Sequence, residues 1–274
     1  MDQPMTNAET LKAVPPATLY LRMGDGDICF ARYEARRETF FEFAPYAVRP
    51  NTSLAVNLRE AKTSEPILEA PIRKVQVLLV GATTLVPLAD FQEEDCETLY
   101  NYTFPSETPR RVFYDMLPSA NAVLLFALDE ITCRILEEEY GNVHYVSALT
   151  PVLRHFSVKG VAAAKRLFAY AHGGMLSVAV FEENKLVMAN TYRMANPVDA
   201  AYYVFNVASH QAMKPTEAAF YVAGTPEERE SISAELRKYA SSVYTINPAG
   251  EYNRHVVAMT SGVPYDLMTL LLDI

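Results

Sequence analysis

The segment from Leu167 to Thr225 is one complete supersecondary unit and the clearest folding signal in the chain. It reads LFAYAHGG, MLSVAVF, EENK and LVMANTY, then a helical stretch, and then AAFYVAGT. Residues at both odd and even positions from 167 to 172 are mostly apolar, so we expect a central strand that is covered on both faces. Gly173-Gly174 permits the positive φ angles that a two-residue hairpin turn requires. The segment therefore predicts three hairpin-linked strands, a helix and a fourth strand.

Capping signals place three helices along the chain. Asn196 before Pro197 is a favourable start for the helix inside this segment. Thr225-Pro226-Glu227-Glu228 is a capping box with proline at the first helical position. Thr150-Pro151 is a similar cap and first-residue pair, from which we expect a helix towards Phe156.

A weaker copy of the same order lies near the N-terminus. Strands are expected at 19–23, 27–35 and 39–44, the last ending before Pro45, followed by a helix over 51–64 and a strand over 74–80. Gly24-Asp25-Gly26 marks the turn between the first two strands. In the second strand, Ile28 and Phe30 would lie on one face, and Cys29, Ala31 and Tyr33 on the other. Both halves thus read βββαβ.

The stretch between the two copies supplies further elements and the boundary. A hairpin is expected from 112–117 and 122–128, joined by Pro118-Ser119-Ala120-Asn121. The small, weakly patterned residues 157–164 are the only such connection in mid-chain. We therefore expect an N-terminal domain over residues 1–158 and a C-terminal domain over 159–274.

The composition of the chain makes some classes of function less favoured than others. The chain has 274 residues and a formal net charge of −9, which disfavours binding to a nucleic-acid phosphate backbone. The stretches without charged residues, 75–89 and 167–181, are shorter than the roughly 20 residues of a membrane-spanning helix. Three scattered cysteines and a start without a secretory signal indicate reduced thiols and a cytoplasmic location.

The duplicated strand–helix order resembles the ribonuclease-H-like unit. In its paired form the order is similar to the actin-like ATPase superfamily, which includes actin, sugar kinases, heat-shock chaperones and bacterial cell-division and pilus-assembly proteins. The phrase Thr83-Thr84-Leu85-Val86-Pro87 also resembles a family of uncharacterised bacterial proteins with this fold. The resemblance covers nearly the whole chain and implies an α/β fold of two ribonuclease-H-like domains.

The resemblance also implies where a nucleotide site would lie. In the superfamily each first hairpin carries an Asp-x-Gly loop that holds phosphate and positions a metal ion. Here Arg22 stands at the acid position of the first loop and Ala171 at that of the second. The adenosine-binding Gly-Gly would map to Ala223-Gly224 and is half present. Because carboxylates that hold magnesium are missing from these positions, the resemblance implies a degenerate member without ATPase activity.

The remaining candidate site residues are few. An anion could still bind to the turn backbones, although hairpin turns favour such residues for geometry alone. His172 could be a base beside the second loop, but its alternating apolar strand favours a histidine in the core or at its rim. The candidates for ligand binding are Gly24, Asp25, Gly26, His172, Gly173, Gly174 and Gly224. We expect no catalytic residue, no metal ligand and no cofactor.

Two functions remain open from the sequence. The first is a non-catalytic actin-like scaffold that acts through an unknown protein partner or by self-association. The second is a nucleotide or small-ligand sensor that uses the cleft between the halves. A sugar-kinase-like enzyme and a nuclease of the same fold are less favoured, because the acids that each reaction needs cannot be named in this sequence.

Overall fold

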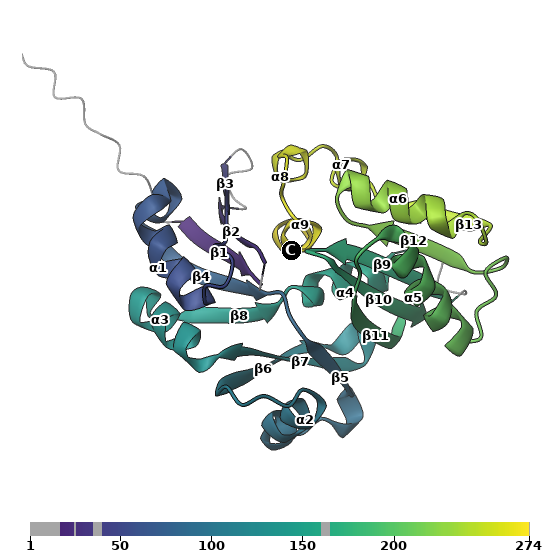
Figure 1. Ribbon diagram of the computed structural model, residues 1–274, viewed down its shortest axis with the longest axis horizontal. Helices are drawn as coiled ribbons and strands as arrows, with labels where there is room; N and C mark the ends of the chain where they lie inside the picture. Colours follow the sequence, from purple (N-terminus) through teal and green to yellow (C-terminus); the bar gives the residue numbers. More distant parts are fainter. Residues whose placement is uncertain (1–16, 25, 35–39, 160–164, 274) are drawn as a thin grey trace, which may run out of the picture.

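Two five-stranded sheets with the same strand order form the body of the protein (Figure 1). The structure, a computed structural model, describes residues 17–24, 26–34, 40–159 and 165–273. The predicted Asp25 of the first turn lies outside the described residues. The shared strand order confirms the two βββαβ units that the sequence predicts.

The first sheet has the order β3-β2-β1-β4-β8. Its strands are β1 (Ala17–Met23), β2 (Ile28–Tyr33), β3 (Phe41–Tyr46), β4 (Ile72–Leu79) and β8 (Val143–Ser147). β1, β2 and β3 are antiparallel neighbours, whereas β4 runs parallel to both β1 and β8. The central strand β1 is therefore enclosed by a hairpin partner and a crossover partner.

The second sheet repeats this arrangement with the order β11-β10-β9-β12-β13. Its strands are β9 (Arg166–His172), β10 (Met175–Glu182), β11 (Lys185–Arg193), β12 (Ala219–Ala223) and β13 (Ser242–Thr245). The hairpin strands are again antiparallel, and β12 is again parallel to both of its neighbours. The two sheets thus match strand by strand.

A small third sheet is inserted in the first half after β4. It contains β5 (Thr83–Pro87), β6 (Arg110–Leu117) and β7 (Ala122–Asp129) in the order β5-β7-β6, and α2 (Cys96–Thr103) packs against it. The predicted hairpin of β6 and β7 is confirmed, and the 83–87 phrase forms β5. The second half has no counterpart to this insertion among the described residues.

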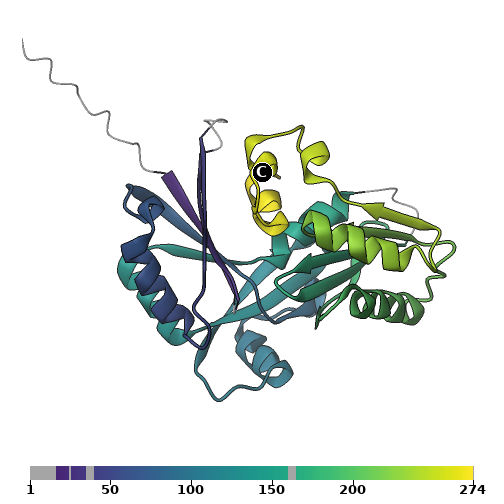
Figure 2. The same cartoon turned by 45° about the horizontal axis from the view of Figure 1, so that its top comes forward.

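Four helices cover the outer faces of the two large sheets (Figure 2). α1 (Leu54–Ser64) and α3 (Glu130–Tyr140) pack on the first sheet, and α5 (Pro197–His210) and α6 (Pro226–Leu236) pack on the second. Phe30 lies in the core under α1 and α3, while Ala31 lies in the core on the opposite face. The predicted alternation of β2 is therefore confirmed.

Two helices lie between the sheets, and each packs against the other half's sheet. α4 (Leu149–Val158) follows β8 but buries Val152 and Phe156 with residues of β9 and β10. α9 (Tyr265–Leu272) ends the chain but buries Leu267 and Leu271 with residues of β2 and β4. The short helices α7 (Pro248–Glu251) and α8 (Val256–Met259) lead to α9. The boundary between 158 and 159 stays a prediction, because the two halves exchange helices across it.

Several predicted element ends differ in the structure by a few residues, among them those of α4, β3 and α1. α4 begins at Leu149, and the Thr150 hydroxyl donates to Asp115 Oδ2 at 2.5 Å instead of capping the helix. Pro151 is tolerated because residues of the first helical turn need no intrahelical N–H donor. β3 continues through Pro45 to Tyr46, because an edge strand tolerates the missing donor of proline. α1 begins at Leu54 with Ser53 as its cap, later than the predicted residue 51.

Candidate functional site

The two hairpin turns face each other across a cavity of about 900 Å³ between the halves. Gly24 and Gly26 line it from the first half, and Gly173 and Gly174 line it from the second. Gly173 and Gly174 have φ angles of 53° and 73°, so the turn has the left-handed backbone that its sequence predicts. The structure thus brings four of the candidate glycines together.

A second cavity of about 470 Å³ adjoins the first at the second hairpin. Gly224 lines this cavity, and His172, Gly173 and Asp27 line both cavities. Residues 258–265, from the end of α8 to the first residue of α9, also line it. The candidate residues that the structure describes therefore surround one divided cleft.

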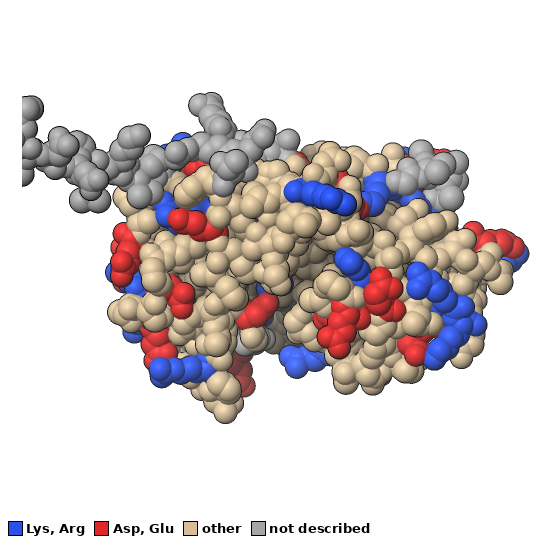
Figure 3. Space-filling model, turned by 90° about the horizontal axis from the view of Figure 1, so that it is seen from above, with Lys and Arg blue, Asp and Glu red and all other residues tan. Residues whose placement is uncertain are grey.

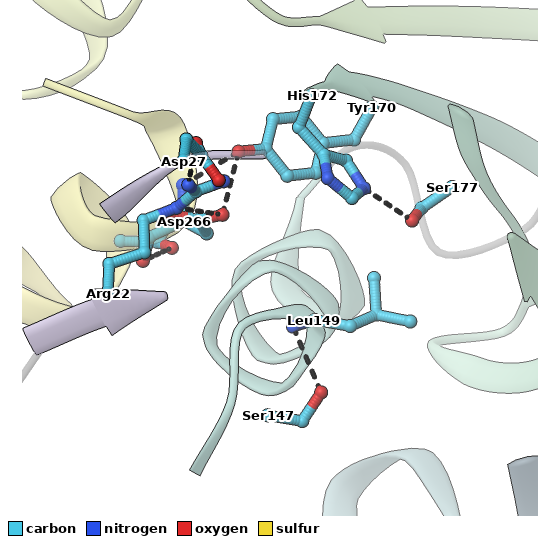
Figure 4. Close-up of polar contacts among 9 residues, drawn as sticks. Arg22, Asp27, Ser147, Leu149, Tyr170, His172, Ser177 and Asp266 are labelled. Carbon is cyan, nitrogen blue, oxygen red and sulfur yellow. Dashed lines mark hydrogen bonds and ion pairs between the residues drawn. The ribbon is translucent and has the colours of Figure 1, made fainter. Parts of the chain in front are cut away.

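Arg22 lines this cleft and is paired with two carboxylates, those of Asp266 and Asp27 (Figure 4). Its side chain is only 1% exposed, and its Nε donates to both carboxylate oxygens of Asp266 on α9, at 2.7 and 2.9 Å. Its Nη1 also forms an ion pair with Asp27. Burial alone would lower the pKa of Arg22. The charge of Asp266, its hydrogen bond to Arg22 and the charges of Tyr170 and Asp27 together outweigh burial, so the pKa is raised well above its usual value.

Tyr170 on β9 reaches the same carboxylate from the second half. Its hydroxyl donates to Asp266 Oδ2 at 3.0 Å and accepts from the Asp266 backbone N–H at 3.3 Å. Burial, together with the charge of Asp266, raises the pKa of the Tyr170 hydroxyl well above its usual value, so it stays protonated as a donor. Asp266 therefore joins β1 of one half to β9 of the other.

His172 is a neutral histidine on the rim of the cleft. Its ring stacks on Tyr170 with centroids 4.6 Å apart, and its Nε2 lies 2.9 Å from the Ser177 hydroxyl. That hydroxyl lies 2.9 Å from Thr191 Oγ1, so a polar chain crosses β9, β10 and β11. Burial lowers the pKa of His172 to about 4. Only one ring nitrogen of His172 has a hydrogen-bond partner, because the buried Nδ1 contacts no polar group among the described residues.

Ala171 and Gly224 serve the packing of the second half. Ala171 belongs to the core under α5, while its neighbours Tyr170 and His172 on either side turn towards the cleft. A Cβ on Gly224 would lie 3.1 Å from Ala171 Cβ, and the φ of Gly224 is 149°. The glycine therefore permits the close approach of β12 to β9.

The sequence-based interpretation did not identify Asp266 or Tyr170 as site residues. Asp266 is 0% exposed within YDLMTLLL, a helix whose other positions are almost all apolar. A lone acid in such a helix indicates a buried ion pair, but the sequence does not name the partner. No group of three or more His, Cys, Asp or Glu side chains within the described ranges could hold a metal ion.

The surface and hydropathy add two observations. On the face shown in Figure 3, Lys and Arg lie among Asp and Glu on both halves. Of the helices that the structure describes, none has the length and apolar character needed to cross a membrane.

Comparison with solved structures identifies the fold. The structure is similar to a Bacteroides thetaiotaomicron protein with an actin-like ATPase fold and unknown function, with a TM-score of 0.78 and 23% identity over 89% of this chain and 96% of that one. It is also similar to the PilM-PilN type IV pilus biogenesis complex, with a TM-score of 0.56 and 12% identity over 93% of this chain and 97% of that one. The protein therefore has the actin-like ATPase fold that its sequence resembles.

Comparison of the sequence identifies the family. Residues 8–243 match a family described as a protein of unknown function, DUF3822, and the chain belongs to that family. No curated protein matches the sequence.

Proposed function

We propose that this DUF3822 protein is a non-catalytic, cytoplasmic scaffold with an actin-like fold that acts through a protein partner or by self-association. The observation that carries the proposal is the burial and ion pairing of Arg22. At the position where a phosphate loop of the superfamily would present a carboxylate, the chain has a buried cation already paired with Asp266 and Asp27.

The energetics of this cluster oppose its use as a magnesium–phosphate site. Removing one partner of a buried ion pair costs about 3–5 kcal/mol, because the remaining charge stays in a medium of low dielectric constant. A ligand that needed Asp266 or Arg22 would have to offset a cost of that order. The cluster is instead suited to holding β1, β9 and α9 together.

Two further observations support a role in assembly. Each large sheet has an apolar core on both of its faces, so the chain's own side chains bury both faces. A protein of the same fold, PilM, occurs in a complex with PilN. The fold can thus belong to a protein that acts within a complex.

The direct test is nucleotide response. We expect no change in melting temperature when ATP and magnesium chloride are added, and no phosphate release above the rate without protein. An increase of several degrees with ATP, or hydrolysis that the Asp25→Ala variant loses, would contradict the proposal. An ATP-hydrolysing protein of the same fold provides the positive control.

The second candidate is a sensor of a nucleotide or another small ligand. The observation that favours it is the divided cleft of about 900 and 470 Å³, lined by the candidate glycines of both hairpins. Crystals soaked with nucleotide and magnesium distinguish the two candidates. Ligand density beside Gly173 would support the sensor, whereas a cleft without ligand would remove it.

A further inference from the structure

The free edge of β11 opens into the larger cavity. β11 is the outer strand of the second sheet, and β5 is the outer strand of the small sheet. Leu85 of β5 packs in the same apolar core as Leu186 and Ala189 of β11, so this end of the edge is covered. Asn190, Thr191 and Arg193 line the cavity instead. The last residues of β11 therefore present an uncovered strand edge to a hollow.

The hydrogen-bond pattern shows which backbone groups point outward. The Met194 N–H donates to Gly174 O at 2.9 Å, and the register pairs Arg193 with Met175. Because the direction of N–H and C=O groups alternates along an antiparallel strand, Thr191 and Arg193 turn theirs away from β10. The Thr191 N–H is occupied by its neighbour Asn190, whose Oδ1 lies 2.8 Å away.

The Thr191 carbonyl and the Arg193 N–H are left without a partner among the described residues. These two groups have the spacing that one residue of an added strand would engage. An unpaired edge of this kind is a template for another extended chain.

The charge and shape of the cavity suggest what that chain carries. No acidic side chain within the described ranges forms an ion pair with Arg193. Two of the described acidic residues line the cavity, and both are engaged elsewhere: Asp27 forms an ion pair with Arg22, and Asp199 accepts from the Ala195 backbone N–H. Phe104, Met175 and Met194 supply apolar wall. The cavity thus offers a cation and apolar surface beside the edge.

We propose that the edge of β11 at residues 191–193 binds an extended peptide segment of a partner protein, with an acidic side chain of that segment opposite Arg193. The main chain of the peptide pairs with the Thr191 carbonyl and the Arg193 N–H, and its apolar side chains contact Phe104 and Met175. This inference rests on the proposed scaffold function and gives its partner a site and a chemistry.

The experiment uses the full chain and a phage-displayed library of random dodecapeptides. Enriched peptides are synthesised with a fluorescein label, and their affinity is measured by fluorescence anisotropy. We expect the enriched set to share an acidic residue flanked by apolar ones. Failure to enrich any sequence would overturn the inference.

Variants at one residue separate backbone pairing from charge. Arg193→Pro removes the outward N–H without touching the bonds to β10, and an edge strand tolerates it. We expect it to weaken binding about tenfold relative to the matched control Arg193→Ala, which removes the charge and keeps the donor. Equal affinity of these two variants would contradict strand addition.

A second variant guards against misfolding of the proline variant. Ala82 lines the opposite wall and is exposed, so Ala82→Trp fills the cavity without altering β11. Loss of peptide binding in Ala82→Trp, with an unchanged melting temperature, is the expected result, and undiminished binding would overturn the inference. ATP hydrolysis would contradict the scaffold itself, whereas absent peptide binding without hydrolysis would contradict only this site.

Discussion

The two hairpins that face the cleft share a topology and differ in chemistry. The first presents Arg22, a buried cation with two carboxylate partners, whereas the second presents the neutral rings of Tyr170 and His172. Both strands keep apolar residues on the face towards the outer helices. The two hairpins thus share the apolar pattern that builds their sheets, whereas the chemistry of their cleft-facing side chains differs.

The largest expected effect comes from breaking the contact that joins the hairpins. Asp266→Ala leaves Arg22 buried beside only the partly exposed Asp27 and should lower the free energy of unfolding by about 3–5 kcal/mol. Urea denaturation monitored by circular dichroism measures this change. The double variant Arg22→Met/Asp266→Leu should recover most of the loss, since no charge is then buried. Equal destabilisation in both variants would show that the ion pair is not the cause.

The second hairpin alone should give the protein a pH dependence through His172. The pKa of His172 falls to about 4 in the folded protein, against about 6.5 in an unfolded chain, so the unfolded state binds the proton more readily. Stability is then fully present above about pH 6.5 and is lost as the pH falls towards 4, by at most about 3 kcal/mol.

Urea midpoints measured between pH 4 and 7 test this dependence. His172→Gln should flatten the profile over this range, whereas the exposed His144→Gln is the control and should leave it unchanged. A profile that is the same in His172→Gln and in the parent protein would assign the dependence to other groups.

The glycines that follow β4 and β12, Gly81 and Gly224, offer a matched comparison of the two halves. Gly224→Ala places a Cβ 3.1 Å from Ala171 Cβ on a residue with φ of 149°, so we expect a loss of roughly 1–3 kcal/mol. A Cβ at Gly81 meets nothing within 4 Å, so Gly81→Ala should change stability by less than about 0.5 kcal/mol. Thermal melts of the two variants measure this difference in stability. Equal shifts in melting temperature would contradict the prediction.

The smallest effect concerns the caps of the equivalent helices α1 and α5. Asn196 accepts from two backbone N–H groups at 2.9 and 3.0 Å, whereas Ser53 accepts from one at 3.4 Å. Asn196→Ala should therefore cost about 1 kcal/mol and Ser53→Ala about half of that. Chemical denaturation of both variants provides the measurement, and a larger loss for Ser53→Ala would reverse the expected order.

Much of the fold follows from local pattern. The alternation in β2 and β9, the turn at Gly173-Gly174 and the capping box at Thr225 are all present as predicted. The predicted start of α4 was wrong, because the Thr150 hydroxyl does not cap the helix. It donates a hydrogen bond to Asp115, which is distant in the sequence. Candidate glycines of both hairpins were identified, since a turn is a local signal. The pairing of Arg22 with Asp266 could not be predicted, because 244 positions separate the two residues in the sequence.

Periodicity and turn chemistry act over a few neighbouring residues. The duplicated strand and helix order and the residues of the two turns can therefore be predicted from the sequence. Three features become visible only in the folded protein: the exchange of α4 and α9 between the halves, the link from Arg22 to Tyr170 through Asp266, and the open edge of β11. Those features depend on which distant surfaces bury one another, and local preferences do not carry that information.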